Sequence, residues 1–385
     1  MSKSTYLKPE YFYNRELSWL SFDYRILGEA QDKTIPLLDR LKFLSITASN
    51  LDEFYMVRVA SLKDMVHAEY DKKDIAGMTP AKQLEEISKV THEFMNDQYR
   101  TYNNSLIPAL KKEGIAILSH YEDLSQKQAK FVDNYFKSEV YPVLTPMAVD
   151  SSRPFPLIRN RSLNIGAILK MKTTAAGASG NGHFRELYIT HNGTKKDGAS
   201  DTDFATVQVP SGLPRVVEIP SEDGFDRTYI MLEQIIERNI HRLFMNYEVL
   251  CAFPYRVMRN ADLTIEEAAD LLMEIEKQIK RRQWGEAIRL QVEAGIDKKL
   301  LKVLKKELHI KEDDIFHING PLDLTFLMKL SGMEGYDELK VPKYTPQQPK
   351  WLNSEDNLFA QIRDHDVLLH HPYETFDPVV NFVRE

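Results

Sequence analysis

The sequence predicts an α+β protein of more than one domain, and three observations support this fold class. In the first 113 residues, apolar residues recur at helical spacing over long stretches. The middle of the chain mixes short apolar runs with helical patterns and lacks the regular alternation of a doubly wound sheet. A stretch rich in proline, glutamine and lysine, Val341–Trp351, then reads as an extended linker to the last residues.

The composition is that of an ordinary soluble globular protein. Of the 385 residues, 43% are hydrophobic and 28% are charged, and this length suits about two to three domains. The formal net charge of −7 argues against broad nucleic-acid binding, although a local basic channel could still hold a polyanion. The single cysteine, Cys251, excludes an intramolecular disulfide and fits a reducing compartment. We see neither a signal peptide nor an apolar run long enough to span a membrane.

Residues 1–113 are predicted to form a helical N-terminal domain of three or four helices. The first is expected over about 11–30, with Asn14 or Ser18 as its cap. Pro36 suits the first turn of the next helix, and a further helical pattern continues to about Glu69. Another long pattern covers about 80–112. The aromatic residues on these helices are expected in the core, because large apolar residues at helical period are mostly buried.

Asn50 lies where two of these helical patterns meet, in the stretch Thr47–Arg58, and its chemistry allows two roles. Ser49 and Asn50 come just before two acids, which is the order of a helix N-terminus capped by a short polar side chain. The same carboxamide has one acceptor and two donors, which match the N6 and N7 edge of adenine. The residues alone leave both roles open, helix cap and adenine contact.

The middle of the chain, 114–345, is predicted to be a mixed α+β domain. Strands are expected at 162–171, 186–190, 205–209, 214–219, 246–259 and 288–292. The last of these is expected to pair with the segment near Tyr255. Helices are expected at 125–140, 231–244, 266–279 and 298–308. The small-residue tract 173–182 is expected to be a mobile hairpin loop.

Basic residues cluster in two places, around Lys280–Arg282 and over Lys298–Lys306. Solvated helix faces are the simpler interpretation, because acids are interleaved with the basic residues. If the protein handles a polyanion, Lys280–Arg282 and Arg289 are expected at the rim of its path. No histidine or carboxylate set has metal-ligand spacing, and no Gly-x-x-x-x-Gly-Lys loop is present, so we expect neither a metal site nor a P-loop here.

Three segments resemble signatures of the type-1 polyphosphate kinase family: Asn14–Phe22, Ser49–Tyr55 and Asp366–Phe376. They come in the family's order and at about its spacing, and the resemblance runs from about Tyr11 to the last residue. It implies a head domain with a role in dimer contact after the helical domain. Residues 346–385 would then be a linker and the first elements of a phospholipase D-like α/β domain. We expect one strand near Val367–Leu369 there, followed by an amphipathic helix.

The resemblance also implies an activity, the reversible transfer of the terminal phosphate of ATP to polyphosphate through a phosphohistidine, with Mg²⁺. The family's asparagine before Leu-Asp-Glu-Phe contacts the adenine of ATP, and it matches Asn50 here. The implied ligands are ATP or ADP and polyphosphate, and the implied assembly is a homo-oligomer. We expect a cytoplasmic location, either free or peripheral to the inner membrane.

No catalytic residue and no metal ligand is expected within this chain. In the family the phosphohistidine, a second functional histidine and the arginines near the metal all follow the third signature. His370 and His371 belong to that signature and do not take the phosphohistidine role. His309-Ile-Lys311 starts the His-x-Lys pattern of phospholipase D-like enzymes but lacks the required aspartate, since position 316 is Phe. The alternative function is a non-catalytic module for adenine-nucleotide binding and dimerisation.

Overall fold

The structure, a computed structural model, describes residues 6–149, 155–172, 202–222, 224–260, 285–350, 352 and 357–384. The chain divides into two compact units, Met1–Met333 and Glu334–Glu385. Each unit is described by itself. None of the described helices is long and apolar enough to cross a membrane.

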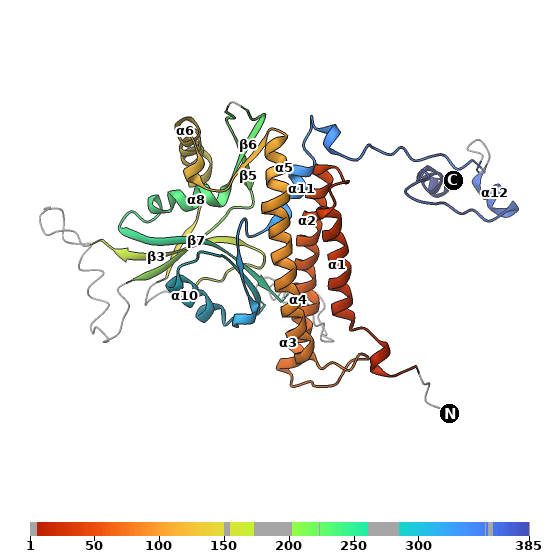
Figure 1. The fold of residues 1–385 in the computed structure, drawn as a ribbon, viewed down its shortest axis with the longest axis horizontal. Helices are drawn as coiled ribbons and strands as arrows, with labels where there is room; N and C mark the ends of the chain where they lie inside the picture. Colours follow the sequence, from red (N-terminus) through yellow and green to blue (C-terminus); the bar gives the residue numbers. More distant parts are fainter. Residues whose placement is uncertain are drawn as a thin grey trace, which may run out of the picture. The chain divides into compact units, whose positions relative to one another are not determined.

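Long helices pack along one flank of the first unit, where α1 contacts both α2 and α4 (Figure 1). Short π-helical segments, Tyr55–Val59 and Tyr102–Leu106, continue α2 into α3 and α4 into α5. The helices of this flank are α1 (Arg15–Gln31), α2 (Leu37–Phe54), α3 (Ala60–His67), α4 (Pro80–Thr101) and α5 (Ile107–Lys112). The predicted helical front of the chain is therefore confirmed.

The two helix starts predicted near the N-terminus have opposite outcomes. Asn14 caps α1 as predicted, because its Oδ1 accepts from the backbone N–H groups of Glu16 and Leu17 at 3.0 Å each. A helix start at Asn50 is wrong, because α2 runs without a break from Leu37 to Phe54. Neither glycine nor proline lies between Leu37 and Asn50, so the helix continues through Asn50. The backbone N–H groups that follow Asn50 already have partners within the helix and need no cap.

Two sheets form most of the rest of the first unit. One has the strand order β1-β6-β5, and the other, of six described strands, has the order β2-β4-β3-β7-β8-β9. Pairing is antiparallel except for β1 with β6 and β8 with β9. The strands are β1 (Ile115–Leu118), β2 (Pro146–Val149), β3 (Leu163–Met171), β4 (Asp203–Gln208), β5 (Val216–Ile219), β6 (Arg227–Met231), β7 (Tyr247–Arg259), β8 (Ala287–Glu293) and β9 (Ile315–Ile318). The accompanying helices are α6 (Gln126–Tyr135), α8 (Leu232–Asn239), α10 (Lys298–Leu308) and α11 (Leu327–Ser331).

Most sequence predictions for this part are confirmed where the structure describes it. The predicted strands correspond to β3, β4, β5, β7 and β8, and Tyr255 pairs with Val292 as expected. The helices predicted over 125–140, 231–244 and 298–308 correspond to α6, α8 and α10, although α8 already ends at Asn239. The strands β1, β2, β6 and β9 were not predicted. The segments 173–182, 186–190 and 266–279 lie outside the described residues.

Side chains alternate across the six-stranded sheet, so its two faces pack on different partners. One face builds an apolar core with α10, to which the strands β7 and β8 and the helix contribute Tyr255, Val257, Leu290, Val292, Leu300 and Leu304. The alternate residues of β7 and β8 lie on the opposite face of the sheet, toward α2, and they include Arg256 and Arg289. The face toward the helices is therefore charged although it is buried.

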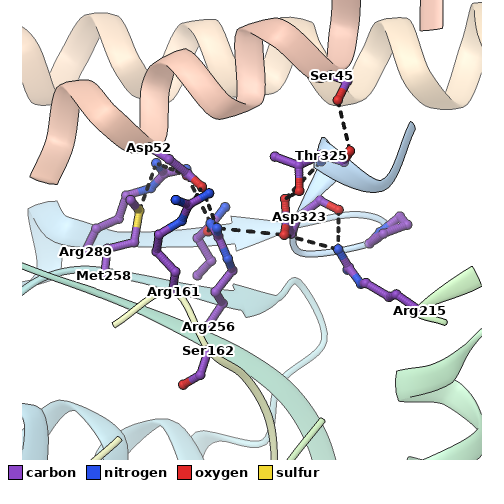
Figure 2. Close-up of polar contacts among 12 residues, drawn as sticks. Ser45, Asp52, Arg161, Ser162, Arg215, Arg256, Met258, Arg289, Asp323 and Thr325 are labelled. Atoms are coloured by element: carbon purple, nitrogen blue, oxygen red, sulfur yellow. Dashed lines mark hydrogen bonds and ion pairs between the residues drawn. The ribbon is translucent and has the colours of Figure 1, made fainter. Parts of the chain in front are cut away.

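A buried ion-pair network joins α2 to this sheet (Figure 2). Asp52 of α2 accepts from both terminal nitrogens of Arg256, at 3.0 Å from Nη1 and 2.5 Å from Nη2. The Nη1 atom of Arg289 lies 3.6 Å from Asp52 Oδ1, the oxygen that also accepts from Arg256 Nη1. The side chains of Arg256 and Arg289 are 2% exposed and that of Asp52 is 4% exposed. A forked pair of this geometry fixes orientation as well as position.

Asp323 extends the network beyond Asp52. Its Oδ2 atom lies 3.8 Å from Arg256 Nη2 and 3.3 Å from Arg215 Nη1, and Arg215 also pairs with Glu233 at 2.7 Å. Burial lowers the pKa of Arg256, but Asp323 and Asp52 outweigh that effect and hold this pKa above its usual value. Burial raises the pKa of Asp323, but Arg256 and Arg215 hold it well below its usual value. Arg256 and Asp323 therefore stay charged over the ordinary pH range.

The second unit contains the helices α12 (Leu358–Asp364) and α13 (Asp377–Arg384) and a β-bridge between Gln347 and Glu374. The amphipathic helix predicted near the end of the chain is confirmed as α13. The strand predicted at Val367–Leu369 is wrong, because these residues have no regular structure. No strand among the described residues pairs with them, and a single extended segment cannot form a sheet alone.

We expect Asp52→Ala to lower the free energy of unfolding by about 3–5 kcal/mol, because it leaves two buried guanidinium groups without their carboxylate. Chemical denaturation of the variant and the unmodified chain measures this loss. Glu53→Ala is the matched control, since Glu53 is the exposed neighbour on the same helix and its loss should change stability by less than about 0.5 kcal/mol. Equal stability of the two variants would contradict the network's role.

Candidate functional site

The two signature segments at the front of the chain lie side by side, because α1 and α2 face each other through matched side chains. Glu16 of α1 accepts hydrogen bonds from Arg58, one of them from Nε at 3.1 Å. One turn further along α1, Trp19 stacks on Phe54 with ring centroids 4.5 Å apart and an angle of 4° between the planes. Residue numbers rise on α1 as they fall on the partner, so the two helices run antiparallel.

The next contact in this series joins Asp23 to Asn50. Asn50 Nδ2 donates to Asp23 Oδ1 at 3.0 Å. Asp23 is completely buried, and its Oδ2 atom has no hydrogen-bond partner among the described residues. Burial raises the pKa of Asp23 to about 7, although the hydrogen bond from Asn50 lowers it. A carboxyl group in such surroundings is expensive to ionise, which is a common property of functional sites.

This contact determines which way the Asn50 amide points. An ionised carboxylate only accepts hydrogen bonds, so the amide must turn its NH₂ group toward Asp23. Asn50 is half-buried, and within the described part of the chain no donor reaches its Oδ1 atom. One acceptor and one remaining N–H are therefore left for a ligand.

An aromatic pair lies one helical turn from this amide. Trp19, which is half-buried, precedes Asp23 by four residues on α1, and it stacks on Phe54, which follows Asn50 by four residues on α2. Phe22, the residue before Asp23 in the sequence, is 50% exposed. On α2 the exposed Glu53 lies about one turn beyond Asn50. An aromatic face beside a polar group with free donor and acceptor positions is a combination that proteins use to bind nucleobases.

Two cavities of the first unit lie away from Asn50. One of about 610 Å³ is lined by α3, α4 and residues 309–314, and Asn50 is not among its lining residues. Another of about 580 Å³ lies beside α8 and includes Glu237, whose pKa burial and three nearby glutamates raise to about 8. Among the residues that the structure describes, no group of three or more His, Cys, Asp or Glu side chains could hold a metal ion.

The other sequence candidates have different outcomes. Arg289 was expected at the rim of a polyanion path, and this is wrong, because its guanidinium is buried against Asp52 and between the rings of Tyr55 and Phe316. The cluster Lys280–Arg282 lies outside the described residues. His370 and His371 are exposed in the second unit.

Asp23 was missed by the sequence reasoning, although a signal was present. It interrupts the apolar stripe of α1, which is formed by Leu20, Leu27 and Ala30. An acid on the buried stripe of an amphipathic helix needs a partner. That partner, Asn50, lies on another helix, so only the fold identifies it.

The raised pKa of Asp23 predicts a pH-dependent stability. Because the native state holds this proton more tightly than the unfolded state, the contribution of Asp23 is most favourable below pH 4. It is lost as the pH rises through about 7. Asp23→Asn should therefore stabilise the chain, by about 2 kcal/mol more at pH 8 than at pH 5.

Urea unfolding at the two pH values measures this difference, with Glu53→Gln as the exposed control that should show none. A gain that is the same at both pH values would contradict the assignment.

Comparison with known proteins gives a consistent result. Residues 12–118 match the sequence model of the polyphosphate kinase N-terminal domain, and residues 127–330 match that of the polyphosphate kinase middle domain. The polyphosphate kinase of Bacillus anthracis is 44% identical over 381 residues, which are 97% of this chain and 51% of that protein. The polyphosphate kinase of Lactiplantibacillus plantarum is 46% identical over 383 residues, which are 99% of this chain and 49% of that protein. The chain spans about half the length of these relatives.

A solved structure supports the same relationship. The crystal structure of polyphosphate kinase from Porphyromonas gingivalis matches with a TM-score of 0.74 and 27% sequence identity, over 97% of this chain and 49% of that one. The predicted mixed α+β fold with a helical N-terminal part is thereby confirmed. Because the middle-domain model alone matches more than half of the residues, and relatives above 40% identity match nearly all of them, this chain belongs to the polyphosphate kinase family.

Proposed function

We propose that the protein containing this chain transfers the terminal phosphate of ATP reversibly to polyphosphate, and that this chain supplies the contact to adenine. The family supports the activity, since the relatives are named polyphosphate kinases. The observation that supports the contact most directly is the Asn50 amide. Asp23 holds one of its N–H groups, and a donor and an acceptor are left one helical turn from the half-buried Trp19 and its partner Phe54.

In this proposal the chemical step takes place outside the chain. The bond between the γ-phosphorus and the β–γ bridging oxygen breaks and ADP leaves, while the γ-phosphoryl group forms a bond to a histidine nitrogen. That P–N bond then breaks as a terminal oxygen of polyphosphate takes the phosphoryl group, and the histidine is freed. A covalent intermediate of this kind divides one difficult transfer into two easier ones. Among the described residues no set of side chains could hold magnesium, and the proposal places its ligands outside this chain, so we assign it no step here.

In the proposed architecture, nucleotide binding, dimer contact and catalysis belong to different domains. Residues 1–113 form the helical domain with the adenine contact, and residues 114–345 form a head domain that pairs two copies of the protein. Residues 346–385 are a linker and the first elements of a phospholipase D-like catalytic domain. ATP or ADP and polyphosphate are the ligands, and the enzyme works in the cytoplasm, free or peripheral to the inner membrane.

The alternative is a module that binds adenine nucleotide and dimerises without catalysing transfer. One observation favours it for the isolated chain: the residues around Asn50 include no nucleophilic side chain with a base beside it. A turnover assay with ATP and polyphosphate, on the 385-residue chain and on the full product of the coding sequence that contains it, separates the two. Transfer by the 385-residue chain itself would exclude the alternative.

For the adenine contact, we expect Asn50→Ala to raise the dissociation constant for ATP about tenfold, because about 1–2 kcal/mol of paired hydrogen bonds is lost. Isothermal titration of the full coding product measures this change. Ser49→Ala is the matched control, since Ser49 is the exposed neighbour whose hydroxyl bonds only to the carbonyl of Ile46. Equal ATP affinity in the Asn50 variant and the unmodified protein would reject the site.

A further inference from the structure

A buried acid, Asp23, is an unusual hydrogen-bond partner for the Asn50 amide. Its carboxyl group is completely buried, it receives a single hydrogen bond from the amide, and one of its oxygens has no partner among the described residues. A buried acid with so little compensation destabilises the folded state. A structural role would be met as well by a neutral side chain, so the negative charge itself requires an explanation.

The charge gives the amide a direction. Rotating the amide by half a turn would place its oxygen against the buried Asp23 carboxylate, with two acceptors facing each other. The ionised acid excludes that orientation, whereas a neutral side chain would permit both. The Asn50 oxygen is therefore held outward, and it is offered to a ligand as a fixed hydrogen-bond acceptor.

We propose that Asp23 is a positioning residue that makes this site select adenine over 6-oxopurines. The inference rests on the proposed function, in which Asn50 contacts the base. An outward amide oxygen accepts from the N6 amino group of adenine, and the remaining N–H donates to N7. Hypoxanthine and guanine carry an oxygen at the position of the amino group, so the Asn50 oxygen would face the oxygen of the base, and neither atom has a proton to donate. Discrimination then comes from the two hydrogen bonds that adenine receives in the orientation fixed by Asp23, whereas a 6-oxopurine leaves two acceptors in contact in either orientation of the amide.

This proposal separates stability from selectivity. If Asp23 only held the helices together, replacing it would lower both stability and nucleotide binding. In our proposal a neutral replacement stabilises the fold at high pH, because it removes a buried charge, and it still weakens the preference for adenine. Proteins commonly trade stability for function in this way.

The test compares the dissociation constants for ATP and for inosine triphosphate at pH 8, above the pKa of about 7 of Asp23, in the full coding product. We expect the unmodified protein to prefer ATP. Asp23→Leu, which is similar in volume and lacks an acceptor, should reduce that preference at least fivefold, through weaker ATP binding, because the amide no longer stays in the orientation that pairs with adenine. Thr47→Val is the matched control, since Thr47 is also buried on α2 but bonds to Gln98 and the carbonyl of Leu44. It should leave the preference unchanged.

The outcomes distinguish this inference from the proposed function. If Asn50→Ala binds ATP as the unmodified protein does, the adenine contact is wrong and this inference falls with it. If Asn50→Ala weakens ATP binding but Asp23→Leu keeps the original preference, only the role of Asp23 is overturned. An unmodified protein without preference for ATP overturns it as well. Should Asp23→Leu fail to fold, Asp23→Asn serves instead. The NH₂ group of the new asparagine can donate to the Asn50 oxygen, so the Asn50 amide can turn toward it. The preference of this variant for ATP should therefore also fall, and an unchanged preference rejects the proposal.

Discussion

The pairing of one buried carboxylate with two buried arginines is the constraint on which the rest of the first unit depends. Asp52 comes from α2, while Arg256 and Arg289 come from neighbouring strands more than 200 residues further along the chain. Once these charges are buried away from water, they destabilise the fold unless they stay in contact with each other. The contact therefore fixes both the position of α2 on the sheet and its rotation about its own axis.

That rotation explains how one short segment serves two purposes. Residues two apart on a helix point about 200° away from each other, so with Asp52 turned to the sheet, Asn50 must face α1. Asp52 holds α2 on the sheet from one side, and on the other side Asn50 has the position that our proposal requires for the adenine contact. A binding group held by an element that is itself locked in place keeps its geometry, which selective recognition requires.

Much of this could be predicted from local patterns, and the failures have a common physical cause. The Asn14 cap, helix α10 and the pairing of β7 with β8 depend on nearby residues or on long apolar runs, and they were predicted correctly. Asn50 has the local sequence of a cap but lies inside a helix, where its amide bonds to Asp23 on another helix. The sequence predicts Arg289 at the rim of a polyanion path, whereas its ion-pair partner Asp52 lies on α2 and buries it. Buried polar partners far apart in the chain leave no periodic signal.

Asp23 and Asp52 show how differently one fold treats two buried acids. Asp52 receives hydrogen bonds from a guanidinium fork and lies beside a second arginine, whereas Asp23 receives one hydrogen bond from an amide. Among the described residues the Oδ2 atom of Asp23 has no hydrogen-bond partner, and its Oδ1 atom holds the Asn50 amide. A cation at Oδ1 would compete with that amide, which would then be free to turn. Each acid therefore keeps a different part of α2 in one orientation: Asp52 holds the helix against the sheet, and Asp23 holds the amide of Asn50.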